Sequence, residues 1–211
     1  MHITKSEIQS LEKIKRLNLI NSITGIKPAN LIGTIDENSN TNLAIFSSTL
    51  HLGSNPAFIG IVVRPANEVR RHTYENIKAN KSFTINHVPT NLAINAHYTS
   101  AKFTKEESEF EHCKFTEEYI ENFAAPFVKE SKVKIWLKLE DEIKIKVNGT
   151  ILLIGSVEHI ILPEEILENE NQINLEKANS AGISGLNCYY AFNFLQELPY
   201  ARKSELPEFR K

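Results

Sequence analysis

Asn42-Leu-Ala-Ile-Phe-Ser-Ser-Thr-Leu-His51, followed by Ala57-Phe-Ile-Gly-Ile-Val-Val-Arg-Pro65, contains two apolar runs around which the chain is organised. Their β-branched and aromatic residues predict two neighbouring β-strands. The connection between them, Leu52-Gly-Ser-Asn-Pro56, is polar and contains the glycine, asparagine and proline that favour a turn. We therefore expect a sheet that is built outward from this pair.

Hydroxyl and cationic side chains stand at the ends of the two runs. Ser47, Ser48 and Thr49 can each donate a hydrogen bond to an anion. Arg64 carries a planar cation that suits phosphate or carboxylate. The pattern predicts a phosphate site, but it also fits hydroxyls that face solvent or pair across the sheet, and these residues alone do not separate the two interpretations.

The composition is that of a globular protein with a substantial core. Of the 211 residues, 41% are hydrophobic and 24% are charged, so we expect one folded domain over residues 1–211. The net charge of −2 gives no general attraction to nucleic acid or anionic lipid, and we expect no nucleic-acid partner and no membrane partner. Any anion site must then be local.

The cysteines and histidines give no sign of a disulfide framework or a metal site. Cys113 and Cys188 have no C-x-x-C partner, and no apolar signal segment opens the chain. No apolar run reaches the roughly 20 residues that span a bilayer. The seven histidines include no close-set ligand pair, so no metal is predicted. We expect a soluble, cytoplasmic protein with reduced cysteines.

Hydrophobic periodicity and turn residues predict a protein that is mainly β with flanking helices. We expect strands over residues 30–36, 42–51, 57–65, 82–88, 133–139, 143–147 and 151–162, and helical segments over residues 4–16, 69–79, 89–97 and, in part, 117–123. Because most strands follow one another directly, a Greek-key or meander barrel fits better than a doubly wound parallel sheet. The irregular, charge-rich stretch 99–132 is interpreted as an excursion from the sheet.

A second basic cluster opens the helix predicted over residues 69–79, with Val69, Thr73 and Ile77 at helical spacing. Arg70, Arg71, His72 and Thr73 are placed in its first turns. A helix N-terminus offers unpaired backbone N–H groups and partial positive charge, so this cluster also suits a phosphate. The alternative is an ordinary solvated basic face.

Sequence motifs of common enzyme classes are missing from the chain. It contains no G-x-S-x-G, H-E-x-x-H, Walker loop or G-x-G-x-x-G. The acidic pairs Glu106-Glu107 and Glu164-Glu165 are interpreted as solvated charges. A bound phosphorylated cofactor would remove the need for a protein nucleophile, because the protein would then supply only position and electrostatics.

The order of several short motifs resembles the flavin reductase-like proteins, which have an FMN-binding split-barrel fold. The first four are Asn42-x-Ala-x-Phe-Ser47, Asn55-Pro56, His72-Thr73-x-x-Asn76-Ile77 and Phe83-Thr-Ile-Asn86. Further along come Ser108-Glu-Phe110, Ala125-Pro-Phe-Val-x-Glu-Ser131, Ile173-Asn-Leu175 and Tyr189-Tyr190. The resemblance covers about residues 20–192, which leaves a helical N-terminal extension and a polar C-terminal tail.

The resemblance implies a homodimer that binds FMN between a strand-loop-strand edge and the partner subunit. The cofactor-binding positions that it implies are Ser47, Ser48, Thr49, Val62, Val63, Arg64, Arg71, His72 and Thr73. Two departures stand out: many members have Lys-Asp-Thr where this chain has Arg71-His-Thr73, and many have proline in place of Ile45. Because a basic residue is kept at the first of these positions, phosphate binding is still expected.

Three functions compete at this stage. The first is an FMN-dependent oxidoreductase that takes a hydride from NADH or NADPH and passes electrons to free flavin or another small acceptor. The second is a non-enzymatic FMN carrier or sensor, and the third is a fold kept without flavin. The excursion over residues 99–132 is long enough to cover or shape the open face of a flavin. A dimer is also expected because the alternating strand Val133 to Leu139 would expose apolar side chains in a monomer.

Overall fold

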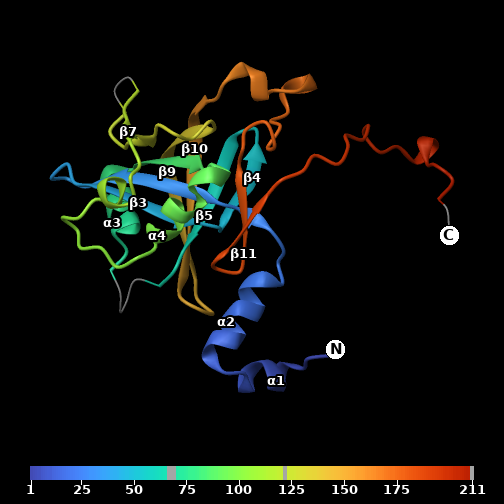
Figure 1. The fold of residues 1–211 in the computed structure, drawn as a ribbon, viewed down its shortest axis with the longest axis horizontal. Helices are drawn as coiled ribbons and strands as arrows, with labels where there is room; N and C mark the ends of the chain where they lie inside the picture. Colours follow the sequence, from blue (N-terminus) through green and yellow to red (C-terminus); the bar gives the residue numbers. More distant parts are fainter. Residues whose placement is uncertain (66–69, 121–122, 210–211) are drawn as a thin grey trace.

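A computed structural model of the chain describes residues 1–65, 70–120 and 123–209, and its main element in this part is a seven-stranded sheet (Figure 1). Every neighbouring pair in the sheet is antiparallel. In spatial order the strands are β3 (Thr41–Phe46), β2 (Asn30–Ile35), β6 (Ser82–His87), β9 (Lys134–Ile145), β10 (Thr150–Ile161), β5 (Ala57–Val63) and β4 (Thr49–Ser54). This order excludes a simple meander and confirms the mainly β, antiparallel prediction.

The sheet has to curl on itself because its two edge strands follow each other in the chain. β3 ends at Phe46 and β4 begins at Thr49 at the opposite edge. The three Cα–Cα steps between these residues span at most about 11 Å. The two edges therefore meet around Ser47 and Ser48 without forming a strand ladder with each other, and the result is a barrel with a split in its wall.

Two large groups of buried residues fill the inside of the barrel and cover one outer face of its wall. The inner group includes Ile32, Ile61 and Val63, and the outer group includes Leu31 and Leu43. Because successive side chains of a strand point to opposite faces, Leu31 of β2 packs in the outer group and Ile32 in the inner group. Position 33 requires glycine because the chain at Pro126 packs closely against it: a Cβ at this position would lie 2.2 Å from the backbone oxygen of Pro126.

Shorter strands and helices surround the barrel. Two small sheets contain β1 (Lys27–Pro28), β11 (Ala181–Ser184) and β12 (Cys188–Ala191), and β7 (Glu117–Glu118) with β8 (Phe127–Val128). The helices of the described part of the chain are α1 (Lys5–Ser10), α2 (Lys13–Ser22), α3 (His72–Asn80), α4 (Ala93–Tyr98) and α5 (Glu109–His112). Short 3-10 turns are η1 (Thr90–Leu92), η2 (Glu164–Ile166), η3 (Asn169–Asn171) and η4 (Lys203–Glu205).

Several predicted elements are confirmed closely. The hairpin around Asn148-Gly149 joins β9 to β10, with Gly149 at φ 75°. The capping box at Thr4 is formed, since its side chain accepts a hydrogen bond from the N–H of Glu7 and the Glu7 carboxylate accepts one from the N–H of Thr4. The strands predicted over residues 30–36, 82–88 and 151–162 correspond to β2, β6 and β10.

Other predicted elements were wrong. The run 42–51 forms two strands on opposite edges of the sheet, and the strands predicted over 133–139 and 143–147 are one continuous β9. The predicted helical fragment at 117–123 contains the strand β7, which pairs with β8. The helix predicted over 4–16 is interrupted at Leu11 and continues as α2.

The expectation that Val133 to Leu139 exposes apolar side chains was also wrong. Val133, Leu137 and Leu139 are buried, at 1%, 0% and 8% exposure. Nor is the edge of β3 open, because the N–H of Leu43 donates to the Glu109 carboxylate at 2.8 Å. Burial raises the pKa of this carboxyl group. The excursion after residue 99 thus seals this edge of the sheet.

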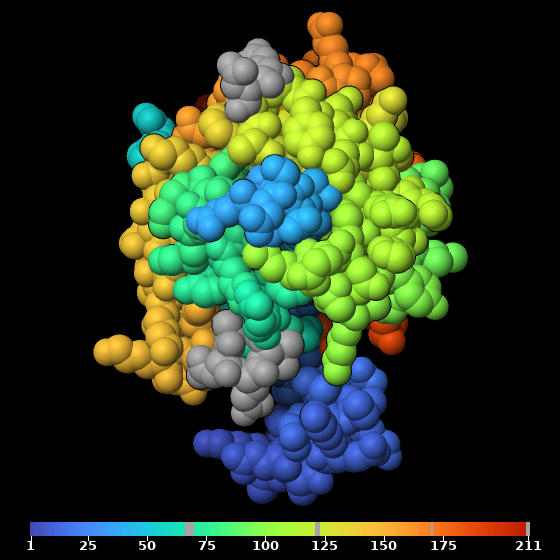
Figure 2. Space-filling view, turned by 90° about the vertical axis from the view of Figure 1, so that its left-hand side faces the viewer, coloured from blue at the N-terminus to red at the C-terminus, as the bar shows by residue number. Residues whose placement is uncertain are grey.

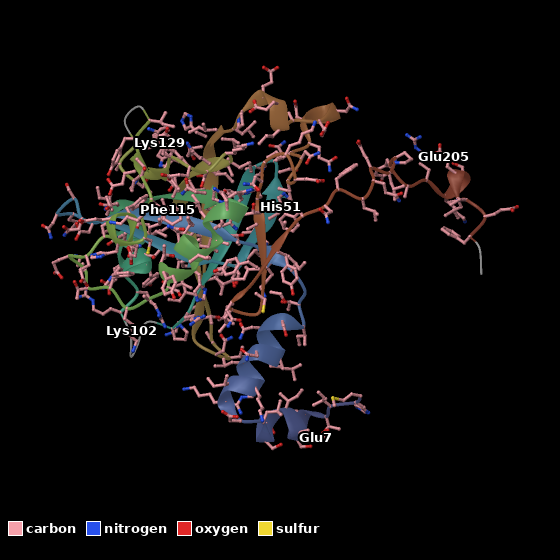
Figure 3. The ribbon with its side chains drawn as sticks, viewed as in Figure 1. Glu7, His51, Lys102, Phe115, Lys129 and Glu205 are labelled. Atoms are coloured by element: carbon pink, nitrogen blue, oxygen red, sulfur yellow. The ribbon has the colours of Figure 1, made fainter. Side chains whose placement is uncertain are left out.

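Both ends of the chain project from the barrel. The dark blue helices α1 and α2 and the red C-terminal segment lie apart from the sheet, and Glu7 and Glu205 lie near the two ends (Figure 1, Figure 3). The polar tail predicted to run to Lys211 is described as far as residue 209. Among the described residues, no helix is both long and apolar enough to cross a membrane.

Candidate functional site

The split in the barrel wall brings the predicted hydroxyl cluster beside β5. Ser47 and Ser48 form the link between β3 and β4, and the N–H of Val62 donates to the backbone oxygen of Ser48 at 3.0 Å. Thr49, the first residue of β4, accepts a hydrogen bond from the amide of Asn30 at 2.8 Å. Asn30 itself is 2% exposed. The hydroxyls therefore line one side of the split.

The three predicted positions at the end of β5 have different surroundings. Val63 is 2% exposed and packs inside the barrel, so its side chain is not available to a ligand. Val62 points to the opposite face of the strand and is partly exposed. Arg64 follows the strand and is exposed. Arg64 is three positions beyond Ile61, the ladder partner of Thr49, which corresponds to about 10 Å along the strand.

The second predicted cluster lies at the N-terminus of α3. The helix begins at His72, Arg71 is its N-cap, and no side chain of the described residues caps it. Arg70 precedes the helix, and Val69, which was predicted to be its first residue, lies outside the described residues. Figure 2 shows α3 on the surface beside the light blue β2–β3 turn, with the amber β9–β10 hairpin on the other side.

Arg71 and Arg64 bring two positive charges together. Burial lowers the pKa of the Arg71 guanidinium from its ordinary value, and the nearby charge of Arg64 lowers it further. The Nε atom of Arg71 is buried and has no hydrogen-bond partner among the described residues. Arg70 differs, because both of its donors to Glu75 are used in an exposed ion pair. Within the described residues, Arg71 therefore keeps an unpaired Nε, whereas Arg70 is paired with Glu75.

Helix α3 is fixed to β2 and β3 by a polar seam, which we define as three hydrogen bonds from asparagine side chains. Asn42 donates to the Thr73 hydroxyl at 3.0 Å, Asn76 donates to the Thr34 hydroxyl at 3.1 Å, and Asn80 donates to a backbone oxygen of β2 at 2.6 Å. Thr73 and Asn76 are buried together with their partners. The seam sets the height and rotation of the helix that bears the second cluster.

The structure joins the predicted residues into a strip between β4, β5 and the start of α3, with the exception of the buried Val63 side chain. Sequence reasoning missed Asn30 as a neighbour of Thr49 and Asn42 as a partner of Thr73. Asn42 was noted only as part of a motif, and nothing local marks Asn30, because its contact with Thr49 spans the split.

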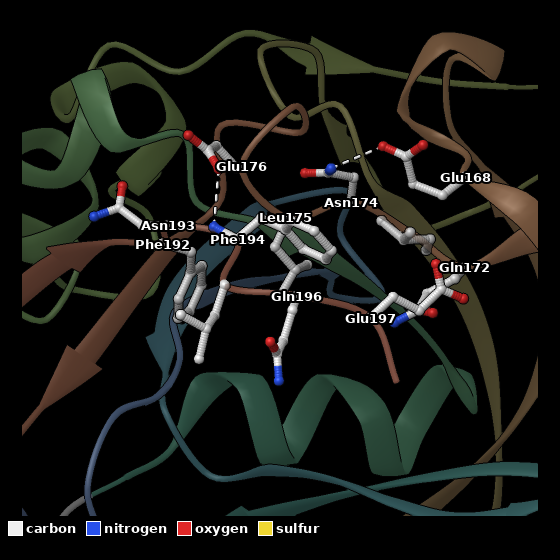
Figure 4. A pocket seen from close by; sticks show the side chains of 12 residues that line it. Glu168, Gln172, Asn174, Leu175, Glu176, Phe192, Asn193, Phe194, Gln196 and Glu197 are labelled. Carbon is white, nitrogen blue, oxygen red and sulfur yellow. Dashed lines mark hydrogen bonds between the residues drawn. The ribbon is translucent and has the colours of Figure 1, made fainter. Parts of the chain in front are cut away.

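A hollow lies away from these residues, under the C-terminal segment (Figure 4). It encloses about 500 Å³ and is lined by the segments 172–176 and 192–197 together with Glu168. The Glu176 carboxylate accepts a hydrogen bond from the N–H of Phe194 at 2.9 Å, which ties the two segments together. None of the nine predicted binding residues lines this hollow. In the part of the chain that the structure describes, no cluster of histidine, cysteine and acidic side chains could hold a metal.

Comparisons with known proteins identify the family and the fold of the chain. The model of the flavin reductase like domain family matches residues 26–180. A structure from Shewanella frigidimarina, assigned as a flavin reductase with a split barrel domain, is 44% identical, with a TM-score of 0.91 over 95% of this chain and 100% of that chain. Among proteins with curated functions, none is significantly similar in sequence.

More distant solved structures share the fold. Nitrilotriacetate monooxygenase component B from Bacillus cereus is 21% identical, with a TM-score of 0.81 over 94% of this chain and 98% of that chain. Flavoredoxin from Desulfovibrio vulgaris is 23% identical, with a TM-score of 0.72 over 83% of this chain and 92% of that chain. These two likenesses establish the split-barrel architecture.

Proposed function

The chain belongs to the flavin reductase-like family, and from this premise we propose that it is an FMN-dependent oxidoreductase that uses NADH or NADPH. Family membership and the split-barrel fold support a flavin-related oxidoreductase. The finer proposal is that a hydride from the nicotinamide reduces bound FMN and that the electrons pass to free flavin or another small acceptor. It rests on the geometry of the strip between β4, β5 and α3.

The observation that carries the proposal is the location of unsatisfied polar atoms. Among the described residues, three buried side-chain atoms have no hydrogen-bond partner: Asn30 Oδ1, Arg71 Nε and Glu142 Oε2. The last lies 2.7 Å from the Lys78 ammonium, so its charge is compensated. The other two lie in the candidate site. Buried polar groups are normally paired, so two such atoms in one site favour a polar ligand.

The residues present fit FMN, with its phosphate at the cationic end of the strip. Arg71 and Arg64 would supply charge-assisted hydrogen bonds, and the uncapped N-terminus of α3 would supply backbone N–H groups at His72 and Thr73. The hydroxyls of Ser47, Ser48 and Thr49 would line the phosphate and ribityl chain, and the Val62–Arg64 backbone would run alongside. When bound, the flavin supplies the redox chemistry, while the protein supplies orientation and charge.

FMN is proposed in preference to FAD because the charge of Arg64 lies near that of Arg71. A terminal phosphate fits such a clustered pair of cations, whereas an adenylate would extend beyond it. Mass spectrometry of the released cofactor tests this point, and recovery of mainly FAD would contradict it.

A homodimer is also part of the proposal. Leu50, Leu52 and Leu152 gather over Gly60, within 3.3 Å of the place where its Cβ would be, and Leu50 and Leu52 remain 38% and 41% exposed. Leu50 and Leu52 of this leucine patch lie on the edge strand β4, which begins at Thr49, and Leu152 lies on β10. Association of two copies there would cover an apolar edge. Light scattering should give about twice the 24.0 kDa chain mass, and a stable monomer that holds FMN tightly would contradict the dimer.

The decisive experiment is anaerobic spectroscopy of the purified full chain reconstituted with FMN. Addition of NADH and then of NADPH should bleach the visible flavin absorbance, and one nucleotide should act at a lower concentration than the other. A protein that binds no flavin would refute the proposal as a whole. A bound flavin that neither nucleotide bleaches would refute the reductase and favour the carrier or sensor.

A further inference from the structure

The hydrogen bond between Asn42 and Thr73 has a defined direction. The Asn42 amide nitrogen is the donor and the Thr73 hydroxyl oxygen is the acceptor, at 3.0 Å. Both residues are buried, at 8% and 6% exposure. A hydroxyl that accepts from one neighbour still has its own hydrogen to donate. Among the described residues no acceptor is paired with this hydrogen, and Thr73 lies in the first turn of α3.

We infer that Asn42 is a positioning residue that makes Thr73 a hydrogen-bond donor to the flavin phosphate. The inference rests on the proposed function, because it assumes that the phosphate sits at the start of α3. Without Asn42, the hydroxyl of Thr73 would rotate more freely and would be only partly oriented toward the anion. With Asn42, rotations that point the hydrogen back toward the amide are disfavoured, because N–H and O–H would then face each other.

The polar seam provides a matched control for this role. Asn76 and Thr34 form the same kind of bond at 3.1 Å, and both are buried, at 4% and 0% exposure. Asn76 lies about one turn further along α3, away from its N-terminus. A purely structural effect of losing a seam bond should therefore appear equally in Asn42→Ala and Asn76→Ala. An effect on phosphate recognition should appear in Asn42→Ala alone.

The test measures the dissociation constants of FMN and riboflavin for each folded variant by flavin fluorescence titration. Riboflavin lacks the phosphate, so the ratio of its dissociation constant to that of FMN isolates phosphate recognition from general loosening of the site. Asn42→Ala and Thr73→Val should each lower this ratio roughly tenfold or more, as expected for loss of a hydrogen bond to a charged group. Thr73→Ser should keep the ratio, and Asn76→Ala should leave it unchanged.

The double variant decides whether Asn42 acts through Thr73. If it does, Asn42→Ala combined with Thr73→Val should lower the ratio no further than Thr73→Val alone. A ratio that falls by the product of the two single effects would overturn the inference. If Asn42→Ala does not fold, Asn42→Asp replaces it: the carboxylate accepts the Thr73 hydrogen, so the ratio should fall, and an unchanged ratio would overturn the inference.

These outcomes are separable from those of the proposed function. A wild-type protein that binds neither FMN nor riboflavin would refute both. A wild-type protein that prefers FMN, with Asn42→Ala keeping that preference, would refute only the role of Asn42. Loss of riboflavin and FMN affinity in equal measure would also refute it, because that result indicates a structural role.

Discussion

Replacement of Arg71 by methionine should separate cofactor binding from folding. Arg71→Met keeps the length of the side chain and removes its charge and donors. A hydrogen bond to a charged group contributes about 1.5–3 kcal/mol, so loss of one such bond should weaken FMN binding about 10- to 150-fold. Riboflavin affinity should change little. The salt dependence of FMN binding should also become weaker, because one of two clustered cations is gone.

Arg71→Met should weaken FMN binding but should not destabilise the flavin-free protein. In the absence of an anion, Arg71 is partly desolvated, has an unpaired Nε among the described residues, and lies near the like charge of Arg64. Its removal should therefore leave the free energy of unfolding equal to or higher than that of the wild type. Urea denaturation of the flavin-free protein measures this quantity.

Arg70→Met is the matched control for Arg71→Met. Arg70 is adjacent and of the same type, but its side chain is 68% exposed and its guanidinium is paired with Glu75. Its replacement should leave the dissociation constants of FMN and riboflavin unchanged. Three results would refute the reasoning. Arg71→Met could bind FMN as tightly as the wild type does, or Arg70→Met could reduce FMN affinity as much as Arg71→Met does. Arg71→Met could also reduce riboflavin affinity as much as FMN affinity.

Three further predictions concern stability, each measured by urea denaturation. Burial alone would raise the pKa of Asp36, but Lys105 and amides of the following turn hold this pKa at about 2. About 2 kcal/mol of stability should therefore be lost as the pH falls from 3.8 toward 2, and Asp36→Asn should abolish that loss. Burial lowers the pKa of His87 from 6.5 to about 4, so the unfolded chain takes up a proton on this residue more readily, and stability should fall as the pH decreases from 6.5 to 4. A His87→Gln variant with the same pH dependence of stability would contradict this. Gly33→Ala places a Cβ 2.2 Å from the Pro126 carbonyl oxygen and should cost about 2 kcal/mol or more, and wild-type stability would show that the backbone yields easily.

Local sequence pattern was sufficient for the elements whose partners are close in the chain. The hairpin from β9 to β10 and the capping box at Thr4 depend on residues only a few positions apart, and both were predicted. The split was not predicted, because Asn42 to His51 looks locally like one strand. Its division at Ser47 arises from two ladders, β2 with β3 and β5 with β4, that lie on opposite edges of the sheet.

The residue types of the proposed site could be recognised in the sequence, whereas its supporting contacts could not. Hydroxyls and arginines can be found in a sequence by residue type, which is how Ser47 and Arg71 were proposed. Whether a side chain faces a core depends on the partner strand, and Val63 illustrates this dependence. The bonds of Asn30 to Thr49 and of Asn42 to Thr73 cross 19 and 31 positions of sequence, so no local pattern indicates them.

The way in which α3 is held explains how the fold tolerates a site with excess positive charge. Only one of the three buried residues of this helix, Ile77, is apolar, so much of its attachment comes from the polar seam. Directional bonds fix rotation more strictly than apolar contacts do, and they keep Arg71 beside Arg64 although the two charges repel. The phosphate of the proposed FMN would meet both positive charges at this end of the site, and its binding would reduce the repulsion between them. Anion affinity and fold stability should therefore be linked, with the seam residue Asn42 contributing to both.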